Sequence, residues 1–260
     1  EYFLLSFGGW QERWKISLPG HGKPVWTTNN SSGISDMDSG DGNTLAPGVW
    51  KHVVMTHDGT NDKIYMNGVP VATKAVAGTL NSTTKPLGIG YNPIDVANYF
   101  NGSLDEVIIF NCALSAGQIA ALYALQNTTP TVSQGLVASY GFSNNTLDAT
   151  TFGNHGQGKD VAAATDRFGY GYSAYTFNGV SSEITAGNSA QLNSAYTTVS
   201  FWVKPRTLPA SGEVFLLSFG GWQERLKISL PRATPRPWTP ASRLKSISRR
   251  RLASSIRPSS

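Results

Sequence analysis

The sequence predicts an all-β protein, folded as an antiparallel β-sandwich. Charged residues make up only 14% of the chain, against about 25% in typical globular proteins, whereas Asn, Ser, Thr and Gly are plentiful. Short apolar runs also recur along the chain with turn residues between them, which is the spacing of a sandwich. The 260 residues suffice for one large domain or two small ones at roughly 150 residues per domain, so the chain can bury a sizeable core.

The clearest element is a three-stranded meander over residues 50–73. Asn67 and Gly68 separate its last two strands, and this pair is typical of a two-residue hairpin turn because both positions require a positive φ angle. Pro70 has no amide hydrogen to give to a strand ladder, so we expect the third strand at a sheet edge.

Further strands are predicted wherever apolar and β-branched residues alternate between turns. Two turn-rich stretches, residues 29–48 and 91–102, are predicted to be the long loops in which a binding site would lie. The polar stretch 127–134 is predicted to be a linker between repeat units. The further strands are expected over residues 85–91, 103–111, 135–142, 173–179, 182–187 and 198–205.

One short helix is predicted after the strand at 103–111. Ser115 and Gln118 have the three-residue spacing of a capping box, in which each side chain binds the other's backbone amide. Ile119, Leu122 and Tyr123 then form one apolar face at helical spacing. We expect this helix to cover part of a sheet.

A nearly identical segment occurs twice in the chain. Residues 1–19 and 213–231 match at 17 of 19 positions, which is too close for two unrelated strands to reach by chance. The chain therefore samples a tandem array, and we interpret it as a fragment of a longer protein. The two copies are expected to compete for one strand position.

The net charge of +5 comes from the C-terminal 29 residues. Residues 232–260 hold seven Arg, Lys245 and no acid, whereas residues 1–231 hold 13 basic and 16 acidic side chains. A nucleic-acid interface needs basic residues spread over a folded face, so no nucleic-acid partner is predicted. Three origins of this basic, disordered tail stay open: a foreign reading frame after Pro231, a basic arm for an anionic surface, or a natural disordered tail.

The sequence also argues against membrane insertion and against a disulfide-stabilised fold. No apolar run approaches the 18 residues of a membrane-spanning helix, so no membrane insertion is expected. The single Cys112 excludes an internal disulfide and is expected to act as a small core residue.

Several motifs together resemble the laminin G-like jelly rolls of the concanavalin A-like lectin/glucanase superfamily. The segment WKHVVMTHDGTNDKIYMNG is similar to the middle of that domain, and FNGSLDEVIIFNCALSAGQIAAL to its closing strand and helix. GLVASYGF, DRFGYGYSAYTFNG and VSFWVKP are similar to its opening half. The resemblance implies a jelly-roll sandwich and covers most of residues 1–231.

The order of these motifs indicates a circular permutation. Residues 1–126 resemble the later part of one unit, and residues 135–231 the earlier part of the next. In jelly rolls of this kind the first and last strands are neighbours, so the resemblance implies that SLDEVIIFN and GLVASYGF pair within this chain.

No enzyme is predicted. Glycoside hydrolysis needs two carboxylates on either side of the scissile bond, and no Glu of the chain begins the Glu-x-Asp-x-x-Glu pattern of the superfamily's hydrolases. Asp105 and Glu106 are adjacent, and alternation along a strand would point them to opposite faces. His52 and His57 are five residues apart, so they too face opposite ways and are interpreted as structural.

Calcium is the one cofactor that the sequence suggests, because it favours oxygen ligands in acidic loops. The stretch DMDSGDGN presents Asp36, Asp38 and Asp41. It departs from the EF-hand order, so a solvated turn is the alternative. Asp105 and Asp148 occupy positions where related jelly rolls often keep a structural ion or a hydrogen-bonded carboxylate.

Aromatic side chains in the predicted loops are the candidates for sugar binding, since a flat ring matches the apolar face of a pyranose. The predicted ligand-binding set combines rings with groups that can hydrogen-bond sugar hydroxyls. Its members are Trp26, Asn29, Tyr91, Asp95, Asn98 and Tyr99.

The function expected from these observations is non-enzymatic binding of a glycan or a surface protein. The resemblance implies a secreted or cell-surface location, within a tandem-repeat protein. Two alternatives stay open: a structural spacer in an adhesin-like array, and an accessory domain of a glycoside hydrolase.

Overall fold

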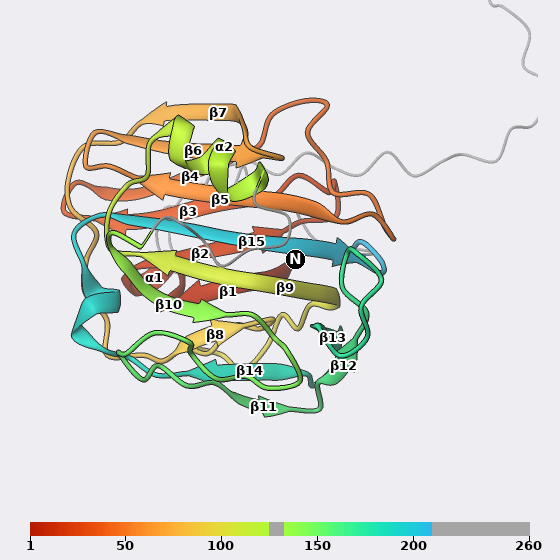
Figure 1. The fold of residues 1–260 in the computed structure, drawn as a ribbon. Helices are drawn as coiled ribbons and strands as arrows, with labels where there is room; N and C mark the ends of the chain where they lie inside the picture. Colours follow the sequence, from red (N-terminus) through yellow and green to blue (C-terminus); the bar gives the residue numbers. More distant parts are fainter. Residues whose placement is uncertain (125–132, 210–260) are drawn as a thin grey trace, which may run out of the picture. The chain divides into compact units, whose positions relative to one another are not determined.

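The computed structural model describes residues 1–124 and 133–209, which form two antiparallel β-sheets (Figure 1). Strands predominate, and only one helix of the described residues has seven or more residues, so the prediction of an all-β sandwich is confirmed. Sheet A has the order β11 (Gln157–Lys159), β14 (Glu183–Ala186), β8 (Leu87–Ile89), β1 (Tyr2–Phe7), β2 (Trp14–Leu18), β3 (Val25–Asn30) and β4 (Gly33–Asp38).

Sheet B faces sheet A across the core. Its order is β12 (Ala162–Ala164), β13 (Ala174–Asn178), β9 (Asn101–Phe110), β15 (Thr197–Pro205), β5 (Lys51–His57), β6 (Asn61–Met66) and β7 (Val69–Ala75). One further strand, β10 (Leu136–Tyr140), pairs with β9.

Both described segments contribute strands to both sheets. In sheet A, β8 lies between β1 and β14, and in sheet B, β9 lies between β13 and β15. The expected pairing of SLDEVIIFN with GLVASYGF is confirmed, because β10 runs antiparallel to β9 with Leu136 opposite Phe110 and Tyr140 opposite Val107. Segments far apart in the sequence therefore complete one sandwich.

The core lies between the sheets and follows the alternation of the strands. In β15, Val199, Phe201 and Val203 point inward, and Val53 and Met55 do so in β5. The alternate residues of these strands face away from the core. This second face of sheet B has its own apolar cluster, which the helix covers.

Helix α2 (Ala116–Ala124) begins at the predicted capping box. The backbone amide of Ser115 donates to Oε1 of Gln118 at 2.9 Å, and the amide of Gln118 donates to Oγ of Ser115 at 3.3 Å. Ile119 and Leu122 are buried against the outer face of sheet B, in front of β5 and β6 in Figure 1. Each amide that the first helical turn leaves without an intrahelical acceptor needs such a cap.

Two local predictions about the meander are confirmed. Asn67 and Gly68 have φ angles of 51° and 79°, as the predicted hairpin turn requires. Strand β7, which carries Pro70, is the last strand of sheet B. No helix among the described residues is long and apolar enough to cross a membrane.

The predicted loop over residues 29–48 is partly wrong. Strands β3 and β4 form a hairpin that ends at Asp38, with Asn30 opposite Gly33. The polar composition of this hairpin predicted a loop. The two strands are instead stabilised by the backbone hydrogen bonds between them, which composition alone does not indicate. Asp36 and Asp38 therefore lie on strand β4.

Candidate functional site

The loop after β8 folds into a compact turn over residues 91–99. The amide of Asn92 donates to the carbonyl of Ala97 at 2.9 Å, and Asn98 has a φ angle of 58°. The amide of Phe3 in β1 donates to the carbonyl of Asn98 at 2.9 Å. These bonds hold the turn against the beginning of β1.

Two tyrosines at the ends of this turn stack on each other. Their ring centroids lie 6.2 Å apart with 12° between the planes. Tyr91 is only 4% exposed, and its hydroxyl lies 2.6 Å from Oγ1 of Thr185 in β14. Burial raises the pKa of Tyr91, against the opposing hydrogen bond with Thr185. The buried ring of Tyr91 therefore packs against the ring of Tyr99. Tyr99 itself is half-buried.

Polar side chains flank Tyr99. Asp95 and Asn98 are exposed. The carboxylate of Asp95 accepts a hydrogen bond from Nδ2 of Asn92 at 3.0 Å, and Nδ2 of Asn98 donates to the carbonyl of Glu1 at 3.3 Å. The structure thus brings four of the predicted ligand-binding residues together in one turn.

The expectation that Trp26 offers a binding surface is wrong. Trp26 lies on β3 with 0% of its surface exposed, and its ring packs 5.6 Å from that of Trp14. Neighbouring Asn29 is used within the fold. Its Nδ2 donates to the carbonyls of Trp10 at 3.2 Å and Gln11 at 2.9 Å, and its Oδ1 accepts from Asn81. Asn29 thereby ties β3 to helix α1 (Gly9–Glu12).

The acidic residues of the first predicted calcium stretch have protein partners. Asp36 accepts a hydrogen bond from Thr27, and Asp38 accepts one from the amide of Gly40 at 2.8 Å. Nζ of Lys23 lies 2.6 Å from Oδ1 of Asp41 and 3.9 Å from Oδ2 of Asp38. Residues 1–124 and 133–209 contain no group of three or more His, Cys, Asp and Glu that could hold a metal. Calcium binding stays a prediction.

Asp148 is buried and accepts four hydrogen bonds. Its Oδ1 accepts from the amides of Ser139 at 3.0 Å and Thr150 at 2.9 Å. Its Oδ2 accepts from Oγ1 of Thr150 at 2.7 Å and the amide of Asn154 at 3.0 Å. Asp148 thus joins β10 to the loop that follows it, and both of its oxygens receive donors.

Sheet B carries a second cluster that the sequence reasoning missed. Strand β9 has a bulge opposite β15, with a register shift between Ser200 and Trp202. Glu106, at the bulge, has a φ angle of 47°. A bulge of this kind redirects the side chains that follow it. As a result, Arg167 reaches both acids: Nη1 lies 3.3 Å from Oδ2 of Asp105, and Nη2 lies 3.1 Å from Oε2 of Glu106.

The expectation that Asp105 and Glu106 point to opposite faces is therefore wrong. Alternation holds for a regular strand, and the extra residue of the bulge breaks it. Burial and the nearby charge of Glu106 raise the pKa of Asp105 to about 8, and the charge of Arg167 opposes this rise.

Aromatic rings enclose the guanidinium of Arg167. Its carbon atom Cζ lies 4.4 Å from the ring centroid of Trp202 and 4.2 Å from that of Phe168. The ring of Trp202 in turn lies 5.2 Å from His52 and 5.7 Å from Tyr123 of α2. Burial and the charge of Arg167 lower the pKa of His52 to about 3, so His52 is a neutral structural residue.

The two strand histidines face opposite ways, as predicted. His52 lies on the outer face of sheet B, and its Nε2 is 2.8 Å from Oγ of Ser200. His57 points between the sheets, where Nδ1 lies 2.8 Å from Oδ1 of Asp62 and Nε2 lies 2.9 Å from the carbonyl of Gly78. Oγ1 of Thr28 in sheet A donates to the other oxygen of Asp62 at 2.8 Å.

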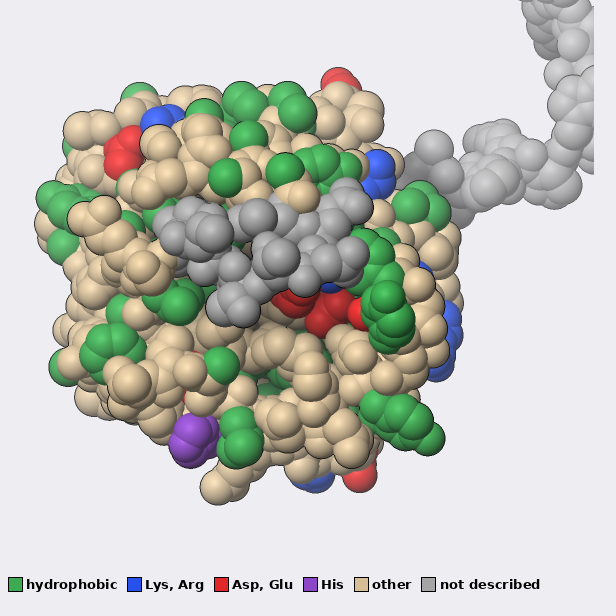
Figure 2. Space-filling view, viewed as in Figure 1, with side chains coloured by type: hydrophobic (Ala, Val, Ile, Leu, Met, Phe, Trp, Pro, Cys, Tyr) green, Lys and Arg blue, Asp and Glu red, His purple; other side chains and the backbone are tan. Residues whose placement is uncertain are grey.

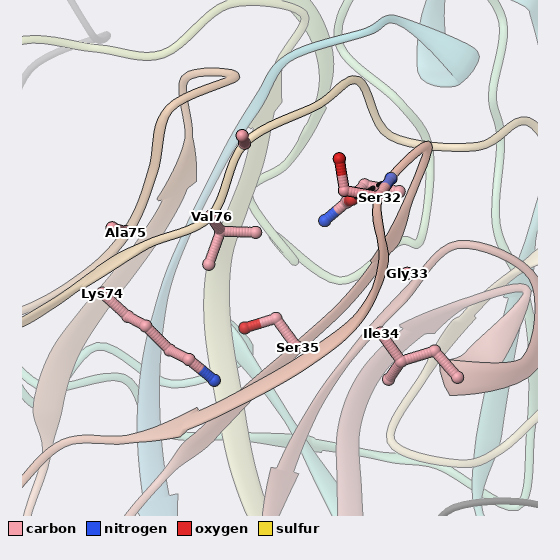
Figure 3. Close-up of a pocket in the computed structure, with 9 residues that line it drawn as sticks. Ser32, Gly33, Ile34, Ser35, Lys74, Ala75 and Val76 are labelled. Atoms are coloured by element: carbon pink, nitrogen blue, oxygen red, sulfur yellow. Dashed lines mark hydrogen bonds between the residues drawn. The ribbon is translucent and has the colours of Figure 1, made fainter.

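A shallow pocket of about 250 Å³ lies between the β3–β4 hairpin and the end of β7. Figure 3 shows Ser32, Ser35 and Lys74 around it. None of the predicted site residues lines this pocket.

An antiparallel two-sheet sandwich with aromatic residues on its loops has the architecture of a lectin-like binding domain. Residues 2–120 match the family model Laminin_G_3, described as the concanavalin A-like lectin/glucanases superfamily. Over this segment, the resemblance inferred from the motifs is confirmed. No curated protein and no solved structure matches the chain. Laminin G-like domains are typically extracellular, and the superfamily suggests a carbohydrate- or protein-binding module.

Proposed function

We propose that this domain is a non-enzymatic, extracellular glycan-binding module that contacts its ligand at the turn over residues 91–99. The observation that carries the proposal is the stacked pair of Tyr91 and Tyr99, flanked by the exposed side chains of Asp95 and Asn98. A pyranose needs this combination of an aromatic face for its C–H groups and polar groups for its hydroxyls.

The turn is arranged before a ligand arrives. Tyr91 is fixed by Thr185 and supports the ring of Tyr99. The Asn92–Ala97 bonds and the bond from Phe3 to Asn98 fix the backbone. Little conformational entropy is then lost when a sugar stacks on Tyr99, which favours affinity from a small contact area.

The contacts of the acids support binding without hydrolysis. A glycosidase needs one carboxyl group as acid and another as nucleophile or base on opposite sides of the scissile bond. In the bulge of β9, the same guanidinium of Arg167 pairs with Asp105 and Glu106. Asp105 is buried and both acids contact the same guanidinium, an arrangement that suits a structural or binding role.

The test is a glycan array probed with the full chain, followed by titration of the best ligand. Tyr99→Ala should weaken binding about tenfold, which corresponds to the roughly 1–1.5 kcal/mol of one aromatic contact. Tyr196→Ala removes another exposed tyrosine, 42% exposed, and should leave binding unchanged. Absence of binding to every glycan would refute the proposal and favour the structural spacer.

Hydrolysis is tested with the same ligands. We expect no new reducing ends after incubation with the protein, because the proposed site holds and releases the glycan intact. Release of reducing ends by the natural sequence but not by Glu106→Gln would overturn the non-enzymatic part of the proposal.

A further inference from the structure

We propose that the loop over residues 166–172, between β12 and β13, forms a second glycan-contact surface together with Glu106, on the outer side of sheet B. This inference rests on the proposed glycan-binding function and adds a site that the loop at residues 91–99 does not share. The loop presents three aromatic side chains within five residues, namely Phe168, Tyr170 and Tyr172.

These rings are exposed to an unusual degree. Tyr170 is 63% exposed, Tyr172 is 69% exposed and Phe168 is 37% exposed. Large side chains grouped in this way on a surface mark binding sites more often than scattered ones do. Figure 2 shows acidic and hydrophobic side chains side by side near the middle of this face of the molecule.

The loop is held rigidly from beneath by Arg167. Its guanidinium lies against the rings of Trp202 and Phe168 and pairs with both acids of the β9 bulge. The Arg167 side chain is only 6% exposed, so these interactions take place away from bulk water, where they are stronger than at the surface. Arg167 is therefore a positioning residue that anchors the loop to sheet B.

Hydrogen bonds to the backbone also hold this loop in place. Oδ1 of Asp166 accepts from the amides of Phe168 at 2.8 Å and Tyr170 at 2.9 Å. The amide of Asn144 donates to the carbonyl of Tyr172 at 2.8 Å. The rings of Phe168 and Tyr170 lie 6.5 Å apart at an interplanar angle of 55°. A ligand thus meets a loop whose backbone is already fixed in place.

Glu106 supplies the polar part of the surface. The positive φ angle of the bulge turns its side chain toward Arg167, and 42% of that side chain remains exposed. Backbone strain of this kind persists where the surroundings hold it, and it is frequent at ligand sites. A carboxylate beside exposed rings can accept hydrogen bonds from sugar hydroxyls.

The charges select the class of glycan. Asp105 is buried, and its raised pKa keeps it largely uncharged at pH 7. Glu106 and Asp166 remain as two acids near the single, largely buried cation Arg167, so the surface has an excess of acid. A polysaccharide that carries carboxylates or sulfates would meet like charge there, whereas a neutral one would not. The geometry therefore points to the pyranose rings of a neutral glycan.

The experiment is affinity electrophoresis of the full chain through gels that contain a neutral β-glucan, a mannan or polygalacturonate. The natural sequence should be retarded by a neutral polysaccharide. The double variant Tyr170→Ala/Tyr172→Ala should bind about tenfold more weakly or worse, and Arg167→Lys should weaken binding although it keeps the charge. Tyr196→Ala is the matched control, and near-ultraviolet circular dichroism checks that each variant is folded.

The outcomes separate the two proposals. If Tyr99→Ala abolishes retardation and the double variant binds like the natural sequence, the second surface is refuted and the proposed function stands. If no polysaccharide retards the natural sequence, the proposed function itself fails. If Glu106→Gln leaves the preference for neutral over acidic polysaccharide unchanged and the double variant binds normally, the aromatic loop has no role in binding.

Discussion

Asp148 offers the sharpest test of how this sandwich is held together. Asp148→Ala removes the acceptor of four hydrogen bonds at a site that is 4% exposed. Water can replace the partner of Thr150, which is only half-buried. The same holds for Ser139, which is also half-buried, whereas the amide of Asn154 loses a charged acceptor in the interior, at about 1–3 kcal/mol. We therefore expect a loss of about 2 kcal/mol in the free energy of unfolding.

Urea denaturation of the full chain at pH 7 measures this loss, once with calcium and once with a chelator. In the chelator arm, Asp41→Ala is the control, because Asp41 is fully exposed, and its midpoint should equal that of the natural sequence. A loss below about 1 kcal/mol for Asp148→Ala would refute the hydrogen-bond argument. If the loss appears only in calcium, Asp148 is a calcium ligand, as the sequence suggested, and the network is secondary.

Two further predictions concern the interior and the repeated segment. Burial lowers the pKa of His57, but the bonds to Asp62 and Gly78 and the charges of Asp62 and Asp58 outweigh this and raise it above 6.5. The ion pair therefore contributes its full stability below about pH 6.5 and loses it as the pH rises through the folded-state pKa; equal pH profiles for His57→Gln and the natural sequence would contradict this. Deletion of residues 213–260 should leave the melting temperature unchanged, since residues 1–19 already supply β1 and β2; collapse of the fold would show that the second copy is the one in use.

Local chemistry explains which elements could be predicted from the sequence. The Asn67–Gly68 turn, the position of β7 and the capping box of α2 each depend on residues within a few positions of one another. The pairing of β9 with β10 followed from the resemblance to jelly rolls and not from local pattern. The turn, the edge strand and the helix cap could be predicted because each depends on residue types that are characteristic of that local structure.

The candidate site was harder to predict because it depends on tertiary placement. Trp26 was expected beside a loop, but pairing of β3 with β2 and β4 turns it into the core. The bulge at Glu106 was missed although SLDEV departs from strict alternation, since Leu104 and Val107 are three residues apart and both reach the core. A second signal was the position of Arg167 among aromatic residues in DRFGYGY, a composition that favours cation–π contacts.

The strand order explains why the chain could not be divided at its linker into two independent sandwiches. If residues 133–209 were removed, β8 would lose β14 and β9 would lose β10, β13 and β15. Unpaired edges and an uncovered apolar face would remain, a state that is unstable and prone to aggregation. In a tandem array, each sandwich would then combine the later part of one unit with the earlier part of the next.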